Sequence, residues 1–187
     1  SGAEAIAVHT PRGVWHVYGL AYPWKRWLLE GETIAGGAVG AQAAIEERLG
    51  AILGMWSHRI RRRRATHPNE PHVGLMHVQV GGAKTSGGEV LAGQEIELSR
   101  AMLDGVPFDF IGLSHLHMWQ EVAERAHYAS STWRNDHSET DRKGWLRVQV
   151  AQHLDEIALP LGTEHARQYF EGGERLAATV EHYASPC

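Results

Sequence analysis

A long amphipathic segment, Val39 to Arg64, constrains the fold of this chain more than any other feature. Its apolar residues recur at spacings of three and four, which predicts a helix with one apolar face. An isolated helix gains little stability from propensity alone, so this face must pack against a sheet or a second helix. The face consists of Ile45, Leu49, Ile52, Leu53, Trp56 and Ile60. A helix this prominent argues against an all-β fold of the cupin type.

Short β-type runs surround this helix, so we predict the α+β fold class. The runs Glu4 to Val8 and Gly13 to Leu20 are separated by a Pro/Gly turn, which predicts a pair of strands. Further strands are expected at Val73 to Val80, Phe108 to Leu113, Arg125 to Ser130, Gly144 to Val150 and Asp155 to Leu161. One short helix is expected around Glu95 to Leu103, and another at Gly173 to Tyr183.

Length and composition are those of one ordinary globular domain. The chain has 187 residues, of which 43% are hydrophobic and 21% charged. No apolar run approaches the ~20 residues of a membrane-spanning helix. The single cysteine, Cys187, excludes internal disulfides and thiolate zinc clusters, and it suits a reducing cytoplasm. The net charge of −4 argues against a nucleic-acid-binding protein that is basic overall, and leaves room for a local basic patch.

Five arginines at the end of the predicted helix could form such a patch: Arg59, Arg61, Arg62, Arg63 and Arg64. The simpler interpretation is that cations at a helix C-terminus interact favourably with the helix dipole and stay solvated. The alternative is a surface that contacts nucleic-acid phosphates. The sequence favours the first interpretation.

Histidines at the ends of two predicted strands form the pattern most suggestive of chemistry. His77 lies on one apolar strand, and His115-Leu116-His117 follows directly after another. Residues i and i+2 of an extended chain point the same way, so two imidazoles from one strand end and a third from a neighbouring strand could surround one metal or bridge two. The sequence therefore predicts a metal site at His77, His115 and His117, and it assigns no other catalytic residue.

These segments resemble the calcineurin-like metallophosphoesterases, and within them the DNA-repair exonuclease subunits of the SbcD type. The resemblance is carried by Val73 to His77, by Phe108 to His117, and by a later block. That block contains Tyr128-Ala129-Ser130-Ser131, Glu139 and Lys143 to Val148. With the opening Tyr18 to Pro23, the resemblance covers most of Val14 to Leu161.

The resemblance implies a β-sandwich flanked by helices and a site for two divalent metal ions. Manganese is the expected metal, with iron or zinc as alternatives. His77 and His115 would bind one ion and His117 the other, and a hydroxide activated by both metals would attack phosphorus in line. The expected activity is phosphodiester hydrolysis by a DNA nuclease, with an ATPase of the SbcC class as partner and a homodimer as the assembly.

The family's D-x-H, G-D and G-N-H motifs do not occur in the sequence, and Ser114 stands where the family usually has glycine. We therefore expect residues 1–161 to be the C-terminal portion of the metallophosphoesterase domain. An upstream segment or a second chain would complete the metal site, and it would cover apolar faces of the strands and of the long helix. Residues 162–187 are expected to be a tail or linker with some helix.

Two other functions remain open from the sequence. The chain could be a non-catalytic scaffold that keeps the fold, or a phosphatase or phosphodiesterase that acts on small molecules. If the substrate is a nucleic acid, Trp119, Trp133 and Arg134 lie near the predicted site in sequence and could contact a strand. An amidohydrolase barrel also uses an H-x-H motif, but the chain is too short after His117 to build one.

Overall fold

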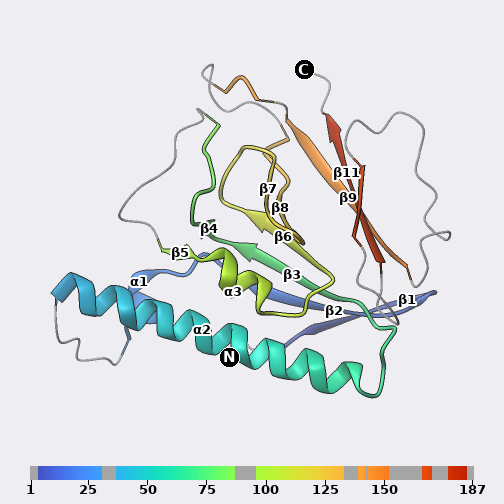
Figure 1. Ribbon diagram of the computed structural model, residues 1–187, viewed down its shortest axis with the longest axis horizontal. Helices are drawn as coiled ribbons and strands as arrows, with labels where there is room; N and C mark the ends of the chain where they lie inside the picture. Colours follow the sequence, from blue (N-terminus) through green and yellow to red (C-terminus); the bar gives the residue numbers. More distant parts are fainter. Residues whose placement is uncertain are drawn as a thin grey trace.

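A computed structural model describes residues 4–30, 37–86, 96–132, 139–141, 143–151, 166–169 and 177–184. Its largest sheet has six strands in the order β1-β2-β3-β6-β8-β7 (Figure 1). The strands are β1 (Ile6–Thr10), β2 (Gly13–Leu20), β3 (His72–His77), β6 (Phe110–Ser114), β7 (Gln120–Ala123) and β8 (Ala126–Tyr128). The four central strands are parallel, whereas β1 and β7 are antiparallel to their neighbours at the two edges. The mixed sheet and the few helices are compatible with the predicted α+β class.

The helix α2 (Gly37–Arg64) packs its apolar face on one side of this sheet, at the lower left of Figure 1. Trp56 is fully buried, and its ring makes edge contacts with Tyr18 of β2 and with Phe108, at centroid distances of 5.7 and 6.0 Å. Ile45, Leu49, Leu53 and Ile60 are buried in the same core. The predicted helix is confirmed, but the expectation that its apolar face lacks a partner is wrong, because the sheet covers it.

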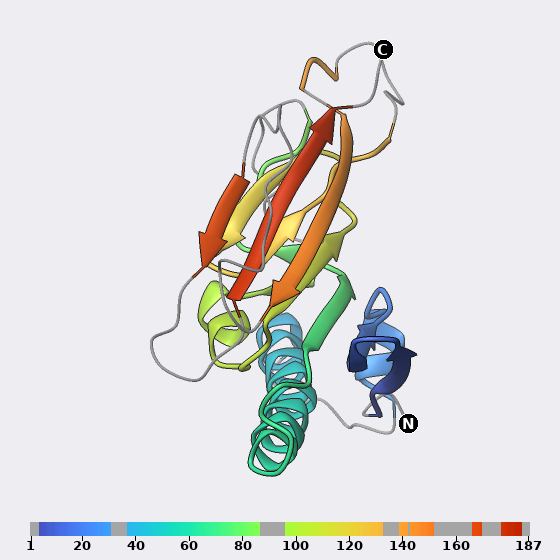
Figure 2. The same cartoon turned by 90° about the vertical axis from the view of Figure 1, so that its right-hand side faces the viewer.

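The opposite side of the sheet faces a second, three-stranded sheet of β10 (Ala166–Tyr169), β11 (Ala177–Ala184) and β9 (Gly144–Ala151). This sheet lies on the right in Figure 1 and towards the viewer in Figure 2. Leu146 and Val148 of β9 pack near Val73 and Phe110, so the two sheets share a small apolar cluster. The remaining space between them is an apolar groove of about 730 Å³.

Several local predictions need correction. The tail forms strand β11, not the helix expected at Gly173 to Tyr183, because its residues pair with β9 along their whole length. The helix expected around Glu95 to Leu103 is instead the short strand β5 (Glu97–Leu98) followed by α3 (Arg100–Asp104), which Ser99 caps by accepting a hydrogen bond from the Met102 amide. The expected strand at Val73 to Val80 is divided into β3 and β4 (Gln79–Val80). The strand expected at Asp155 to Leu161 lies outside the described residues.

A polar cluster closes the edge of the sheet where β3 begins. The carboxylate of Glu70 accepts hydrogen bonds from Arg63 at 2.6 Å and contacts His16 Nε2 at 2.7 Å. The interaction with Arg63 holds the pKa of Glu70 at about 2. Arg64 donates to Asp109, which also accepts from the backbone amide of His72. Two of the five arginines, Arg63 and Arg64, therefore stabilise the fold through these ion pairs.

Among the described residues, no helix is long and apolar enough to cross a membrane.

Candidate functional site

The carboxyl ends of β2, β3 and β6 meet at one edge of the sheet, opposite the polar cluster. The register pairs Leu20 of β2 with Met76 of β3, and it pairs His77 of β3 with Ser114 of β6. Open sheets with parallel strands place their ligand sites at this edge, because the loops that follow the strands are brought together there. The chain thus brings three loops to one place.

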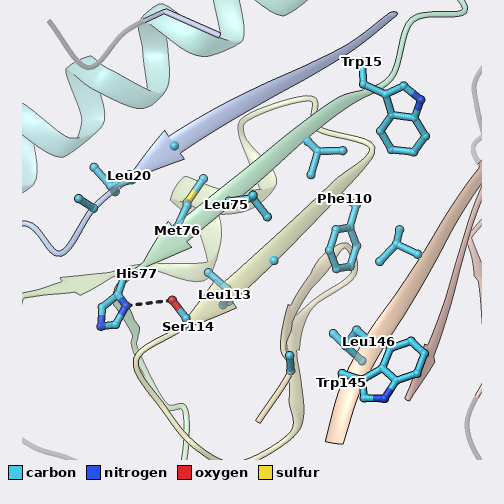
Figure 3. A pocket seen from close by; sticks show the side chains of 16 residues that line it. Trp15, Leu20, Leu75, Met76, His77, Phe110, Leu113, Ser114, Trp145 and Leu146 are labelled. Carbon is cyan, nitrogen blue, oxygen red and sulfur yellow. Dashed lines mark hydrogen bonds between the residues drawn. The ribbon is translucent and has the colours of Figure 1, made fainter. Parts of the chain in front are cut away.

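His77 is the last residue of β3, and its side chain is exposed on the groove side of the sheet. Its Nδ1 lies 3.0 Å from the hydroxyl oxygen of Ser114 (Figure 3). This contact depends on a side chain that a glycine at position 114 would lack. Ser114 is therefore a partner that orients the imidazole of His77.

His115 follows directly and has an unusual backbone conformation, with φ at +103°. Such an angle is rare for a residue with a side chain, and residues held in this way often lie at functional sites. The ring of His115 lies 5.4 Å from that of His77, centre to centre, in an edge-to-face arrangement. The ring of Tyr22, just after β2, contacts both histidines at 5.2 and 6.0 Å.

His117 contacts different groups. Its Nδ1 lies 3.5 Å from Glu139 Oε1, and its backbone carbonyl accepts a hydrogen bond from Lys143 Nζ at 3.0 Å. His115 and His117 would point the same way only if the backbone between them were extended. Strand β6 ends at Ser114, however, and the turned backbone at His115 removes the shared direction of residues i and i+2.

Lys143 is the centre of a buried polar network. Its side chain has no exposed surface, and its ammonium group lies 2.8 Å from Glu139 and 3.1 Å from Asp141. Ser86 Oγ is a further partner at 3.1 Å. A buried ammonium group is costly unless it is paired and hydrogen-bonded, and these contacts meet that requirement. The network fixes Glu139 beside His117.

The pair His77 and His115 has a spacing that suits one metal ion. Two imidazoles that bind a tetrahedral ion through bonds of about 2.0–2.1 Å have ring centres about 5 Å apart. The observed 5.4 Å between the two ring centres fits this requirement. Within the described ranges, however, no group of three or more His, Cys, Asp or Glu side chains could hold a metal ion. The described residues therefore include two histidines at a suitable separation, but not a complete metal site.

Behind His77, the strand is held by a buried tyrosine. Tyr128 of β8 donates from its hydroxyl to the carbonyl of Val78 at 2.7 Å and accepts from the amide of Val80 at 3.0 Å. Burial raises the pKa of Tyr128 well above its usual value, so the hydroxyl stays protonated and can donate. These bonds stabilise the break between β3 and β4, immediately after the histidine.

The apolar groove begins beside the same histidine. Figure 3 shows its lining from His77 and Ser114 to Trp15, with Trp145 and Leu146 of β9 on the facing side. Leu75 is half exposed towards this space, which is unusual for leucine in the centre of a sheet.

Sequence reasoning missed Tyr22, Ser114 and Lys143 as parts of the site. Tyr22 could have been found, because it follows a predicted strand that ends at the same edge as the histidines. Glu139 and Lys143 have the i,i+4 spacing of an ion pair, but nothing local to the sequence places them beside His117. Trp119 is partly buried, and Trp133 and Arg134 lie outside the described residues.

Comparison with known proteins adds no family to this description. No family model matches the chain, and no curated protein matches it. The resemblance to calcineurin-like metallophosphoesterases therefore stays a prediction from the residues and motifs of the chain.

Proposed function

We propose that this chain is part of a metal-dependent phosphodiesterase of the calcineurin-like class, specifically a DNA nuclease of the SbcD type. The observation that carries the proposal is the pair His77 and His115, brought together from the ends of two neighbouring parallel strands at a ring distance of 5.4 Å. Two sheets that face each other, with helix α2 on the outer side of one, support a calcineurin-like sandwich.

In this proposal the chain supplies the histidine side of a two-metal site. His77 and His115 would hold one divalent ion and His117 the second, with manganese as the expected metal and iron or zinc as alternatives. When bound, such ions provide Lewis acidity towards the phosphodiester and an activated water as nucleophile. The carboxylates that balance their charge would come from an upstream segment or a second chain.

Ser114 and Glu139 each contact the Nδ1 atom of a histidine and so help to orient its ring. Ser114 Oγ contacts Nδ1 of His77, so it restricts the rotation of that ring. Glu139 lies beside Nδ1 of His117 and favours the tautomer with a proton on Nδ1, which leaves Nε2 free of a proton and able to bind a cation. Lys143 keeps Glu139 in place, so both are positioning residues rather than catalytic ones.

Metal titration tests the histidine pair directly. Calorimetry with Zn²⁺ or Mn²⁺ is expected to show saturable binding that is lost when His77 and His115 are both replaced by Ala. The matched control replaces His58 and His67, two exposed histidines at the end of α2 and in the loop after it, and should retain binding. Equal binding by both double variants would refute the assignment of the pair.

The role of Glu139 has its own readout. In ¹⁵N spectra of the metal-free protein, Glu139→Ala should shift the His117 ring away from the Nδ1-protonated tautomer, and Glu139→Gln, which keeps an acceptor, should restore it. Asp141→Asn removes the other carboxylate next to Lys143 and is expected to leave the tautomer unchanged. A shift caused equally by Asp141→Asn would show that only the stability of the network matters.

The alternative is a scaffold that keeps the fold without catalysis, and the absence of a third metal-binding group within the described ranges favours it. Hydrolysis of a phosphodiester by the protein with its complementary segment or chain decides between the two. His117→Ala should abolish this activity, and unchanged activity would favour the scaffold. Activity on small phosphodiesters without any on DNA would point to the small-molecule enzyme.

The remaining parts of the proposal concern context. A DNA-repair nuclease of this type would work with an ATPase of the SbcC class and as a homodimer, in the cytoplasm, where the single cysteine Cys187 would remain reduced. Co-purification with such an ATPase and the mass of the native assembly test these partners.

A further inference from the structure

The helical turn after β2 exposes two tryptophan side chains and buries a single leucine. Helix α1 (Lys25–Leu28) begins after Trp24, whose carbonyl accepts from the Leu28 amide at 3.1 Å. Leu28 is buried in the main core, whereas Trp24 and Trp27 are 69% and 48% exposed. Tryptophan is usually among the more buried residues, so two exposed copies on one anchored turn call for a function.

The exposed part of this turn combines two aromatic rings with two cations. Trp24, the N-cap of the turn, and Trp27 are three residues apart, and both rings are exposed. Lys25 and Arg26 lie between them in the sequence and are exposed, and the first turn of α1 contains no acidic residue. The protein as a whole carries a net charge of −4, so this small basic area differs from the average of the chain. We call Trp24, Lys25, Arg26 and Trp27 the tryptophan platform.

The platform adjoins the histidine pair through Tyr22. The ring of Tyr22 makes an edge contact with Trp24 at a centroid distance of 5.1 Å and lies 5.2 Å from the ring of His115. Only one ring therefore separates Trp24 from a proposed metal ligand. Leu28 is buried in the main core and anchors the turn that follows Trp24.

We propose that the tryptophan platform binds single-stranded nucleic acid by stacking its bases on Trp24 and Trp27. Exposed aromatic rings beside cations are the arrangement that such strands require, because the rings accept bases of any sequence and the cations attract the phosphates. The inference deepens the proposed function, since it identifies a single-stranded region next to the scissile bond as the substrate. A strand held there would present a neighbouring phosphodiester to His77 and His115.

Fluorescence anisotropy with a labelled oligo(dT) tests the platform in the presence of EDTA, so that neither metal binding nor hydrolysis is needed. Trp24→Ala is expected to weaken binding roughly 5- to 150-fold, the range for loss of one stacked base. Trp145→Ala is the matched control, because Trp145 is 48% exposed but lies on β9 in the apolar groove. It should bind oligo(dT) like the wild type.

Two further arms separate stacking from charge. With an abasic oligonucleotide, Trp24→Ala and the wild type should bind equally, because no base remains to stack. The double change Lys25→Gln with Arg26→Gln should make the slope of log K against log [salt] less steep by up to about 1.4. Each lost phosphate contact accounts for about 0.7 of this change.

The proposal is overturned if Trp24→Ala binds oligo(dT) like the wild type, if Trp145→Ala is equally weakened, or if duplex DNA competes as well as the single strand. Thermal unfolding of each variant checks that it is folded, which is expected because the changed side chains are exposed. Oligo(dT) binding at Trp24 together with failed metal titration would retain the platform and reject the metal site. Metal binding without oligo(dT) binding would retain the metal site and reject the platform.

Discussion

A buried histidine at the start of β3 should make the stability of this protein strongly dependent on pH. The side chain of His72 has no exposed surface. Burial, together with the positive charge of Arg64, lowers its pKa from 6.5 to about 3. In the unfolded chain His72 therefore binds a proton near pH 6.5, whereas in the folded protein it binds one only near pH 3. Because the unfolded state binds more protons in this interval, the free energy of unfolding decreases as the pH falls.

The magnitude follows from the width of the interval. Each pH unit between the two pKa values changes the free energy of unfolding by about 1.4 kcal/mol. From pH 8 to pH 5, His72 should therefore remove about 2 kcal/mol of stability. Glu70, with a pKa lowered from 4.5 to about 2, acts in the same direction but only below pH 4.5, so it contributes little in this range. The comparison between pH 8 and pH 5 therefore leaves Glu70 out, and a variant of His72 separates its contribution from that of the other histidines.

Urea unfolding at the two pH values measures the difference for the wild type and for His72→Asn. Asparagine does not titrate, and its amide oxygen can accept from Tyr18, whose hydroxyl lies 3.2 Å from Nδ1 of His72. The variant should lose about 2 kcal/mol of the pH dependence, whatever its absolute stability. Val73→Ala, which removes core volume but no titrating group, should keep the full dependence. A His72→Asn protein with the wild-type dependence would refute the reasoning.

Three further predictions concern stability and use the same urea assay at pH 8. Trp56→Ala should lower the free energy of unfolding by about 3–5 kcal/mol, because the ring is fully buried between α2 and the sheet; a loss under about 1 kcal/mol would contradict this packing. His115→Gly should be more stable than His115→Ala by about 1 kcal/mol, since only glycine relaxes at φ +103°, and the opposite order would show that the backbone is unstrained. Gly74→Ala should cost about 1–3 kcal/mol because its Cβ would lie 3.2 Å from the buried Phe108 ring. Gly112→Ala should cost less, since its Cβ would meet the end of the half-exposed Leu75 side chain, and equal costs would argue against this difference.

Elements with a strong local pattern were predictable from the sequence. Helix α2, the β1–β2 hairpin and strand β6 each combine a clear hydrophobic period with turn residues at their ends, and these predictions are confirmed. Strand β7 has no such pattern, because its four residues include Gln120 and Glu121 and it gains its partner only by pairing with β8. The tail strand β11 likewise depends on β9, which is distant in the sequence.

The candidate site was predictable only in part. One predicted strand carries His77 and another is followed directly by a histidine, and this was enough to predict that His77 and His115 lie close together. The position of His117 could not be predicted, because a single residue with positive φ after β6, His115, changes the direction of the chain. The buried Lys143 pairs with Glu139 and also joins Ser86 and the carbonyl of His117. The last two contacts connect segments far apart in the sequence and leave no local trace in it.

The connection between β2 and β3 has a consequence for how the chain acquires its structure. These strands are neighbours in the sheet, yet the whole of α2 lies between them in the sequence. Their pairing must close a long loop before any ladder hydrogen bond compensates the lost chain entropy, and such topologies fold slowly. The helix can form early, and β3 can then pack against the apolar surface formed by Trp56 and its neighbours. Variants that weaken this surface should therefore slow refolding as well as accelerate unfolding.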